Sequence, residues 1–522
     1  MVLLVGALVA ASCTTDDDDA SGADGTRDVP SNVAELMDAD EYATARWALR
    51  VAPIEGDGAT SEVAPDKISA MASNAKLYSV GTWLDVYGPD DTIETPVYGL
   101  GEVGGGTLGG DLVLRAMGDL VMGGREAGSG ELGYSVPPQP DANGLPGAMP
   151  SPGDPLAGLN ELAEQVAAAG VTDVGGNVVI DDRLFEPWTT PRPLEVSPIV
   201  INDNLMAIVT TPGTEGEPAT IEAIPETAAF TVVNDTETVA AGADSTIELE
   251  PVPDAEGEPT NTLTVSGQIA TDSDPTLNIY DVPDPASFAR TLFIEALQRA
   301  GVTVTADPLA VNEAGALPDA DSYETDNDPL ATLTSPPLSE IATLIWKISH
   351  NYGADLSVCL LAVSEGSTDC EDGFAPIRSR IDDRGINQDE VWMLDGSGSN
   401  MASTTPHAMT TWIQWLHTLD WGDQLTEMLP ILGTDGSLTL AQQDSPAKGK
   451  VQAKTGTWAS HDPGSGLFLM LDQSLAGLME SDDGETYAFA VYLNGTTVQT
   501  PDELLDILDQ VAGVAAALQQ SL

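Results

Sequence analysis

The chain alternates between stretches in which apolar residues recur every three or four positions and shorter stretches rich in β-branched residues. The first spacing predicts helices that bury one face, and the second predicts strands. Helices are predicted at residues 156–170, 288–300 and 501–522, and from Leu338 towards Ser349. Strands are predicted at residues 177–180, 302–304, 451–457 and 487–493, and one within 392–398 that enters a tight turn. The pattern indicates a fold that mixes helices and strands.

The middle of the chain has a different pattern. Five short β segments lie between residues 198 and 285, at 206–211, 220–224, 230–233, 246–249 and 262–265. Turn-forming and acidic residues separate them, which predicts a small β domain. Residues 99–110 are rich in glycine but lack the Gly-Lys-Ser/Thr of a phosphate-binding loop, so we interpret them as β-turns. The polar, acidic stretch 313–328 predicts a linker.

Composition adds a size and a charge. The 522 residues are 42% hydrophobic, enough for two to four domains with buried cores. The net charge of −65 comes from 83 Asp and Glu against 18 Lys and Arg. Binding of nucleic acid through phosphates requires basic patches, so that class of function is excluded. Solubility in a salty medium and an acidic function such as cation binding both remain open, although no acidic cluster has the spacing of a calcium loop.

The first residues predict export. Residues 1–12 are apolar and end in small residues before Cys13, which resembles the end of a bacterial lipoprotein signal. The basic region expected before such a segment is missing. Lipid attachment at Cys13 is the first hypothesis, and plain secretion or a buried helix are the alternatives. The acidic residues 14–30 predict a tether.

The other two cysteines, Cys359 and Cys370, have no spacing typical of a zinc site or a redox pair. A disulfide between them, outside the cytoplasm, and a buried thiol at Cys359 are both compatible with the sequence.

The first candidate for chemistry is the pair Ser73 and Lys76. Residues three apart lie on one face of a helix, so the Lys76 amine can approach the Ser73 hydroxyl. A serine becomes a nucleophile when a neighbouring base takes its proton, and a partly desolvated lysine can be that base. The chain has only six lysines, which makes a lysine in this position informative.

Two later triplets complete the pattern. Ser349-His350-Asn351 follows a predicted helix, and Lys454-Thr455-Gly456 lies on a predicted strand. Ser-x-x-Lys, Ser-x-Asn and Lys-Thr-Gly in this order are typical of serine acyl-transferases that react with penicillin. Each triplet alone recurs by chance, whereas all three in order favour a shared active site.

The spacing and longer matches identify a family. Between Ser73 and Ser349 lie some two hundred residues more than a class A β-lactamase has. The chain resembles the D-alanyl-D-alanine carboxypeptidase/endopeptidase family, the class C low-molecular-mass penicillin-binding proteins. The matching segments include residues 72–77, 109–112, 178–182, 335–341, 395–398, 429–436 and 449–457.

The resemblance implies a mixed α/β (α+β) fold: a penicilloyl-serine-transferase (β-lactamase/transpeptidase-like) domain with an antiparallel sheet flanked by helices, plus inserted, mostly β domains. The catalytic domain is expected at 31–93 and 325–522, an inserted domain at 94–197 and 286–324, and a nested small β domain at 198–285. Residues 1–30 are the signal-like segment and tether.

The resemblance also implies roles for the three motifs. Ser73 attacks the substrate carbonyl, Lys76 takes its proton, Ser349 relays a proton to the leaving nitrogen, and Asn351 holds the substrate amide and Lys76. A second group binds the substrate: Lys454 and Thr455 its carboxylate, Gly456 its backbone, and the N–H groups of Ser73 and Thr457 the oxyanion.

The implied activity is cleavage of D-Ala-D-Ala ends or cross-links of peptidoglycan through an acyl-serine, without a metal or another cofactor. The expected partners are peptidoglycan peptides and β-lactams, and not nucleic acid. A β-lactamase with the same chemistry and a non-catalytic cell-wall-binding lipoprotein are the alternatives. Two positions depart from the family, His350 where Asp or Asn is common and Leu120 where Pro is common.

Overall fold

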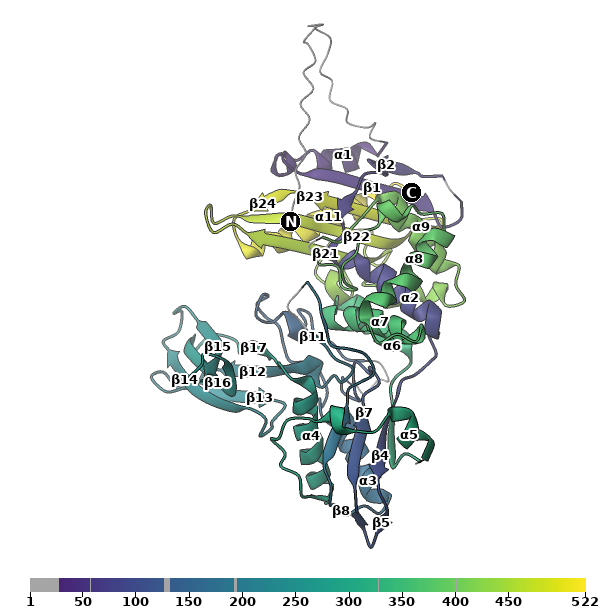
Figure 1. Ribbon diagram of the computed structural model, residues 1–522. Coiled ribbons are helices and arrows are strands. Elements are labelled where there is room, and N and C mark those ends of the chain that lie inside the picture. Colours follow the sequence, from purple (N-terminus) through teal and green to yellow (C-terminus); the bar gives the residue numbers. More distant parts are fainter. Residues whose placement is uncertain (1–27, 57, 126–131, 192–194, 327, 400) are drawn as a thin grey trace, which may run out of the picture.

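The structure, a computed structural model, describes residues 28–522 except 57, 126–131, 192–194, 327 and 400. Both ends of the described chain contribute to one antiparallel sheet with the strand order β2-β1-β23-β22-β21, and β24 pairs with β22. Its strands are β1 (Arg46–Pro53), β2 (Ser61–Val63), β21 (Val451–His461), β22 (Phe468–Glu480), β23 (Thr486–Asn494) and β24 (Thr496–Val498). Figure 1 shows this sheet at the top of the molecule.

Alternation along these strands gives the sheet two apolar faces. One face, with Leu49 and Phe489, packs against α1 (Ser31–Met37) and α11 (Pro501–Gln519). The other face, with Ala48 and Tyr492, packs into a larger core. That core contains the helices α2 (Lys76–Tyr87), α6 (Leu338–Lys347), α7 (Asn351–Ser364), α8 (Phe374–Asp383), α9 (Pro406–His417) and α10 (Leu425–Met428). The sheet therefore lies between two layers of helices.

A second part of the molecule, below the first in Figure 1, has its own core. Its main sheet has the order β19-β4-β7-β9, formed by β4 (Glu94–Leu100), β7 (Asp111–Arg115), β9 (Val178–Asp181) and β19 (Ala331–Thr334). A second sheet joins β5 (Val103–Gly104), β6 (Thr107–Leu108), β8 (Asp173–Val174) and β18 (Thr303–Val304). The helices α3 (Ala157–Ala168) and α4 (Pro285–Arg299) cover them. The pairing of β19 with β4 places this strand in the second part, although it follows residue 325.

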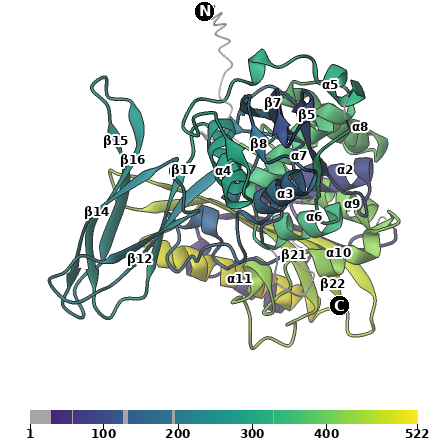
Figure 2. The same cartoon turned by 90° about the horizontal axis from the view of Figure 1, so that it is seen from below.

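The nested strands form two three-stranded sheets that project to one side in both views (Figures 1 and 2). One sheet has the order β13-β12-β17 and the other β14-β16-β15. The strands are β12 (Leu205–Thr211), β13 (Thr220–Ile224), β14 (Thr231–Val239), β15 (Thr246–Pro253), β16 (Pro259–Ala270) and β17 (Thr276–Asp281). Residues 205–281 therefore form β structure, as their pattern predicts.

Most sequence-predicted elements are confirmed, including the helices α3, α4, α6 and α11 and the strands β9, β18, β21 and β23. Two predictions are wrong. The segment 392–398 has no strand, because Trp392 pairs only through an isolated bridge to Ser403. The acidic stretch 313–328, predicted to be a linker, contains the helix α5 (Ala320–Asp326), in which Tyr323 is buried against Tyr98.

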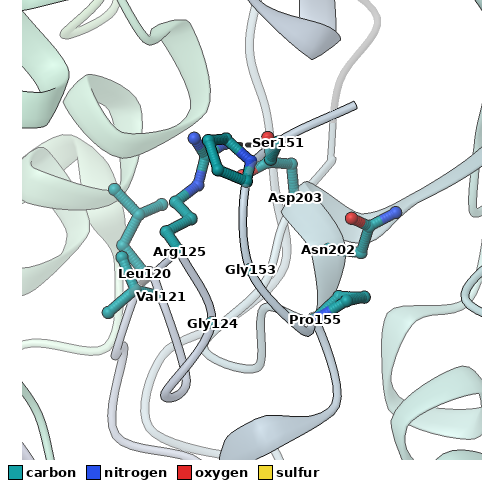
Figure 3. A pocket seen from close by; sticks show the side chains of 10 residues that line it. Leu120, Val121, Gly124, Arg125, Ser151, Gly153, Pro155, Asn202 and Asp203 are labelled. Carbon is teal, nitrogen blue, oxygen red and sulfur yellow. Dashed lines mark hydrogen bonds and ion pairs between the residues drawn. The ribbon is translucent and has the colours of Figure 1, made fainter. Parts of the chain in front are cut away.

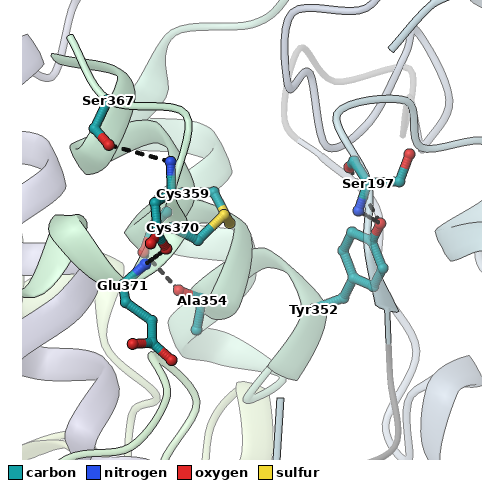
Figure 4. Close-up of a disulfide and its surroundings, with 9 residues drawn as sticks. Ser197, Tyr352, Ala354, Cys359, Ser367, Cys370 and Glu371 are labelled. Atoms are coloured by element: carbon teal, nitrogen blue, oxygen red, sulfur yellow. Dashed lines mark hydrogen bonds between the residues drawn. A yellow bond between two sulfur atoms is a disulfide. The ribbon is translucent and has the colours of Figure 1, made fainter. Parts of the chain in front are cut away.

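The alternative left open for the cysteines is resolved. Cys359 and Cys370 form a disulfide that joins α7 to the short 3₁₀ helix at Cys370–Gly373 (Figure 4). Both cysteines are buried in the larger core, and Cys359 lies in the second half of α7. Cys13, proposed as a lipid attachment point, lies outside the described residues.

None of the helices formed by the described residues is both long and apolar enough to cross a membrane.

Candidate active site

Ser73 and Lys76 meet at the start of α2. A 3₁₀ turn at Ala72–Ala75 leads into the helix, and Lys76 Nζ lies 2.7 Å from Ser73 Oγ. Lys76 is fully buried, and Ser73 is only 8% exposed. Because the two atoms are within hydrogen-bond reach, a proton can pass directly between the two side chains.

Two tryptophans fix the first turn of α2. Trp346 Nε1 donates to the carbonyl of Lys76 at 3.0 Å, and Trp412 Nε1 donates to that of Leu77 at 2.9 Å. Both indoles are buried in the core between α6, α9 and α2. Because buried indoles need a hydrogen-bond partner, these two contacts set the height and rotation of the serine-bearing turn.

Lys76 has further partners from two distant segments. Its Nζ lies 2.8 Å from Asn351 Oδ1 and 2.8 Å from the carbonyl oxygen of Ser397. The turn that holds Ser397 requires glycine at Gly398, where φ is +89° and a Cβ would overlap the Ala72 carbonyl. Residues 395–398 are among the segments that resemble the family, but the sequence assigned no role to Ser397. The reason is that the backbone carbonyl of Ser397, and not its side chain, makes the contact with Lys76.

Ser349, His350 and Asn351 form the junction between α6 and α7. Ser349 has φ of +58°, a left-handed conformation that reverses the chain between the helices. Asn351, the first residue of α7, reaches Lys76. Ser349 is half-buried, and among the described residues its hydroxyl makes no hydrogen bond. The structure thus joins Asn351 to the pair directly and leaves the Ser349 hydroxyl free to bond a ligand.

The strand β21 carries Lys454, Thr455, Gly456 and Thr457 alongside the Ser73 turn. Asn74 Nδ2 donates to the Lys454 carbonyl at 3.2 Å, which joins the turn to the strand. A Cβ on Gly456 would lie 2.6 Å from the Met71 carbonyl oxygen, so only glycine permits this approach.

Thr455 Oγ1 lies 2.8 Å from Ser437 Oγ, and Thr457 Oγ1 donates to Gln473 Oε1 at 3.0 Å. The contacts join Ser73, Lys76 and Asn351 to one another and join the strand of Lys454 to the Ser73 turn, while Ser349 lies there as the chain neighbour of the 350–351 segment.

Lys454 is fully buried, and its Nζ donates to the carbonyl of Thr455 at 2.7 Å. Burial lowers the pKa of Lys454 well below its ordinary value, the charge of Lys76 lowers it further, and Asp141 raises it. Asp141 comes from the second part of the molecule, within the 3₁₀ turn Gln139–Asp141. The sequence missed this residue, because no motif surrounds it and only the fold brings it near Lys454.

Two buried carboxyl groups, Asp355 and Asp395, lie behind Lys76. Asp355 Oδ1 accepts from Ser397 N at 2.8 Å, and Asp395 Oδ1 accepts from Gly398 N and Ser399 N. Burial and then the charge of Asp395 raise the pKa of Asp355 to about 7, while Lys76 lowers it. These groups hold the turn that presents the Ser397 carbonyl.

Comparison with known proteins identifies the family. The profile of the D-Ala-D-Ala carboxypeptidase 3 (S13) family matches residues 29–518. A D-alanyl-D-alanine carboxypeptidase of Actinomadura sp. (strain R39) is 26% identical over 462 residues, which cover 84% of this chain and 75% of that protein. A penicillin-sensitive carboxypeptidase A of Dictyostelium discoideum is 26% identical over 247 residues, 45% of this chain and 43% of that protein.

Among solved structures, penicillin binding protein 4 of Haemophilus influenzae superposes with a TM-score of 0.64 at 18% sequence identity, covering 93% of this chain and 99% of that one. The same protein complexed with a β-lactam gives the same score. At this identity the likeness shows the fold, and it confirms the fold class predicted from the sequence.

Proposed function

Because this chain belongs to the D-Ala-D-Ala carboxypeptidase 3 (S13) family, it is a serine-type D-Ala-D-Ala carboxypeptidase, and we propose that it cleaves peptidoglycan stem peptides through an acyl-serine on Ser73. The single observation that carries the mechanism is the position of Lys76 Nζ, 2.7 Å from Ser73 Oγ and 2.8 Å from Asn351 Oδ1. Lys76, as the base, therefore lies between the nucleophile Ser73 and Asn351 of the second motif. Ser73 and Asn351 both belong to elements that a buried core holds in place.

In the acylation step, Ser73 Oγ attacks the carbonyl carbon of the penultimate D-alanine while its proton passes to the amine of Lys76. The C–N bond to the terminal D-alanine then breaks, and Ser349 relays a proton to the leaving nitrogen. The N–H groups of Ser73 and Thr457 stabilise the oxyanion. Water hydrolyses the ester in the second step, which restores Ser73 and releases the shortened peptide.

Lys454 and Thr455 recognise the terminal carboxylate in this proposal. Burial lowers the pKa of Lys454, and a bound carboxylate opposes this shift because it favours the ammonium form. Substrate binding therefore completes the charge pair, and a substrate without the carboxylate gains nothing from this residue.

Intact mass spectrometry of the protein incubated with benzylpenicillin tests the mechanism. We expect a stable adduct that maps to Ser73, none on Ser73→Ala, and an unchanged adduct on Ser364→Ala, a serine at the far end of α7. An adduct that disappears within seconds would identify a β-lactamase. Folded protein with no adduct, and peptidoglycan binding equal in Ser73→Ala, would identify a non-catalytic binding protein.

The choice of peptide bond needs separate substrates. Release of D-alanine from a pentapeptide measures carboxypeptidase activity, and cleavage of a cross-linked dimer measures endopeptidase activity. We expect Ser73→Ala to abolish both, because each requires the same acyl-serine.

We also propose that the protein acts outside the cytoplasm, anchored through a lipid on Cys13. The disulfide between Cys359 and Cys370 supports an oxidising location, since cytoplasmic thiols are kept reduced. The apolar residues 1–12 before Cys13 support the anchor. Cys13→Ser should move the protein from the membrane fraction to the soluble exported fraction, and equal membrane content of the two forms would contradict the anchor.

A further inference from the structure

The loop at residues 197–204, between β11 (Glu195–Val196) and β12, contacts the α6–α7 junction. Its last three residues, Asn202, Asp203 and Asn204, all have left-handed backbone conformations with φ of 53°, 58° and 56°. Asn and Asp tolerate this conformation better than other residues with a side chain. Asn204 Oδ1 accepts from Ile201 N at 3.0 Å, so the loop holds its own shape and directs the Asp203 carboxylate out of it.

Asp203 connects a cation of the second part to the second motif of the catalytic part. Its Oδ2 accepts from Arg125 Nη2 at 2.5 Å, and its Oδ1 lies 3.1 Å from His350 Nε2. The side chains of Arg125, Asp203 and His350 are 7%, 3% and 0% exposed. Figure 3 shows Arg125 and Asp203 facing each other beside a small cavity. Burial would raise the pKa of Asp203, but Arg125 and His350 lower it below its ordinary value, so the group is a carboxylate.

The hydrogen bonds of His350 determine its tautomer. His350 Nδ1 accepts from Gly353 N at 3.0 Å, as the N-terminal cap of α7. A neutral imidazole has one donor and one acceptor, so Nε2 carries the proton and donates it to Asp203. The ring therefore spans a fixed distance between the cap of α7 and the loop, and both ring nitrogens are used.

A continuous path of contacts runs from this carboxylate to the nucleophile. His350 lies between Ser349 and Asn351, and Asn351 Oδ1 lies 2.8 Å from Lys76 Nζ, which contacts Ser73. We propose that Asp203 is a positioning residue for acylation, which acts through His350 to hold Asn351 and Ser349 in register with Lys76. This inference rests on the proposed function of Ser73. It gives a reason for a histidine at the middle position of the motif, since Asn or Asp there is too short to span both contacts.

A second contact docks the same loop independently. The Tyr352 hydroxyl accepts from Ser197 N at 2.7 Å (Figure 4). It also accepts from Asn204 Nδ2 at 3.0 Å. Because Tyr352 keeps the loop against α7 without Asp203, loss of the Asp203–His350 bond should misalign the motif without releasing the loop. The two contacts can therefore be tested separately.

The first test is Asp203→Asn, which keeps the shape but replaces one oxygen with a donor. If the amide NH₂ faces His350 Nε2–H, two donors meet; if it faces Arg125, the guanidinium loses its counter-charge. We expect the first-order rate of acylation by benzylpenicillin at saturation to fall about 10- to 100-fold, because a small misplacement of a reacting group lowers a rate by this much. The dissociation constant of the encounter complex should be nearly unchanged.

The second test is His350→Asn, which keeps an oxygen to cap Gly353 N but withdraws from Asp203. We expect a loss of rate similar to that of Asp203→Asn, because the span is broken in both. The double variant should be no slower than either single one, since both remove the same contact. Wild-type rate in His350→Asn would show that only the helix cap matters and would overturn the proposal.

The matched control is Tyr352→Phe, which removes buried hydrogen bonds from the same loop without altering the Asp203–His350 contact. All rates are measured below the unfolding temperature of each variant. We expect the acylation rate of Tyr352→Phe to lie within about threefold of the wild-type rate. This is a much smaller loss than the 10- to 100-fold loss expected for Asp203→Asn. An equal loss in Tyr352→Phe would overturn the proposal, because loose docking would then explain both. An adduct on wild type with an unchanged rate in Asp203→Asn would overturn the positioning role alone, whereas no adduct on wild type would overturn the proposed function itself.

Discussion

At the scale of the residue, the site depends on side chains that are unusual in a protein interior. Lys76 and Lys454 are two fully buried lysines within interaction range of each other, and Asp355 and Asp395 lie behind the first. Buried charges are costly unless they are paired and hydrogen-bonded. Lys76 has such partners in the turn at Ser397 and in the carboxyl groups behind it. The charged groups buried around Lys76 are therefore the ones that its role as the base requires.

Asp355 gives a pH prediction. Its pKa is about 7 in the folded protein and about 4 in an unfolded chain, so folding takes up a proton between these values. The free energy of unfolding should therefore fall as pH rises from about 4 to about 7, by up to about 1.4 kcal/mol per unit from this group. Asp355→Asn, which keeps the acceptor for Ser397 N, should reduce that slope in urea unfolding at pH 5, 6 and 7. The exposed Asp90→Asn should not, and an unchanged slope in Asp355→Asn would contradict the prediction.

Gly456 gives a steric prediction. A Cβ there would meet the Met71 carbonyl oxygen at 2.6 Å, with Asn74 Nδ2 and Ser474 Oγ also in the way. Gly456→Ala should push β21 from the Ser73 turn, slow penicillin acylation at least tenfold and destabilise the fold by about 1–3 kcal/mol. The strand glycine Gly104, where a Cβ meets nothing, provides the control Gly104→Ala. Equal acylation by both variants would show that the close approach is not needed.

At the scale of the element, the active site is the meeting point of three element ends. The 3₁₀ turn before α2, the start of α7 and the first half of β21 come from residues 72–75, 351 and 451–457. Each end is fixed by burial of the element behind it, through Trp346 and Trp412 for α2 and through the core around Tyr352 and Ala354 for α7. Rigid elements with reactive residues at their ends give the geometric precision that acyl transfer requires.

The disulfide should contribute to stability more than to chemistry. It closes a loop between Cys359, in the second half of α7, and Cys370, eleven positions further on. Removing it in Cys359→Ser/Cys370→Ser should cost about 2–3 kcal/mol in the free energy of unfolding. The rate of penicillin acylation at low temperature should stay within about twofold of wild type, because the core around α7 keeps Asn351 in place. A large loss of rate in a folded variant would show that the bond also aligns the site.

At the scale of the whole molecule, the catalytic part is one sheet between two helical layers, and the second part reaches it through Asp141, Asp203 and the 197–204 loop. The whole chain carries a net charge of −65. Like charges repel over about 10 Å at 0.1 M salt but over only about 3 Å at 1 M. The charge therefore opposes compactness in dilute salt and has little effect in concentrated salt.

This charge predicts a salt-dependent stability. The midpoint of thermal unfolding should rise steadily between 0.1 M and 2 M KCl, because screening removes repulsion that is larger in the folded state. Sucrose at matched osmolality separates screening from exclusion at the surface, and it should give a smaller rise. A midpoint that is independent of KCl would show that the acidic surface does not limit stability.

The sequence by itself determined the elements and the chemistry. Apolar spacing located α3, α4, α6, α11, β21 and β23, because one buried face imposes a period along the chain. Three short motifs predicted seven candidate site residues, because acyl transfer needs these side chains at fixed local spacing, and the resemblance added Thr457. The turn at 392–398 and the helix α5 were misjudged, because an isolated bridge and a short acidic helix depend on tertiary contacts and leave no period.

Only the tertiary structure decided which distant groups complete the site. Ser397 contributes a backbone carbonyl, Asp141 and Asp203 come from other parts of the molecule, and Asp355 matters through its burial. None of these roles has a local signature, since an isolated aspartate or a carbonyl looks the same anywhere in a sequence. Long-range packing alone brings them within hydrogen-bond or Coulomb range of the motifs, because interactions of a few ångströms depend on the folded position and not on the order of residues.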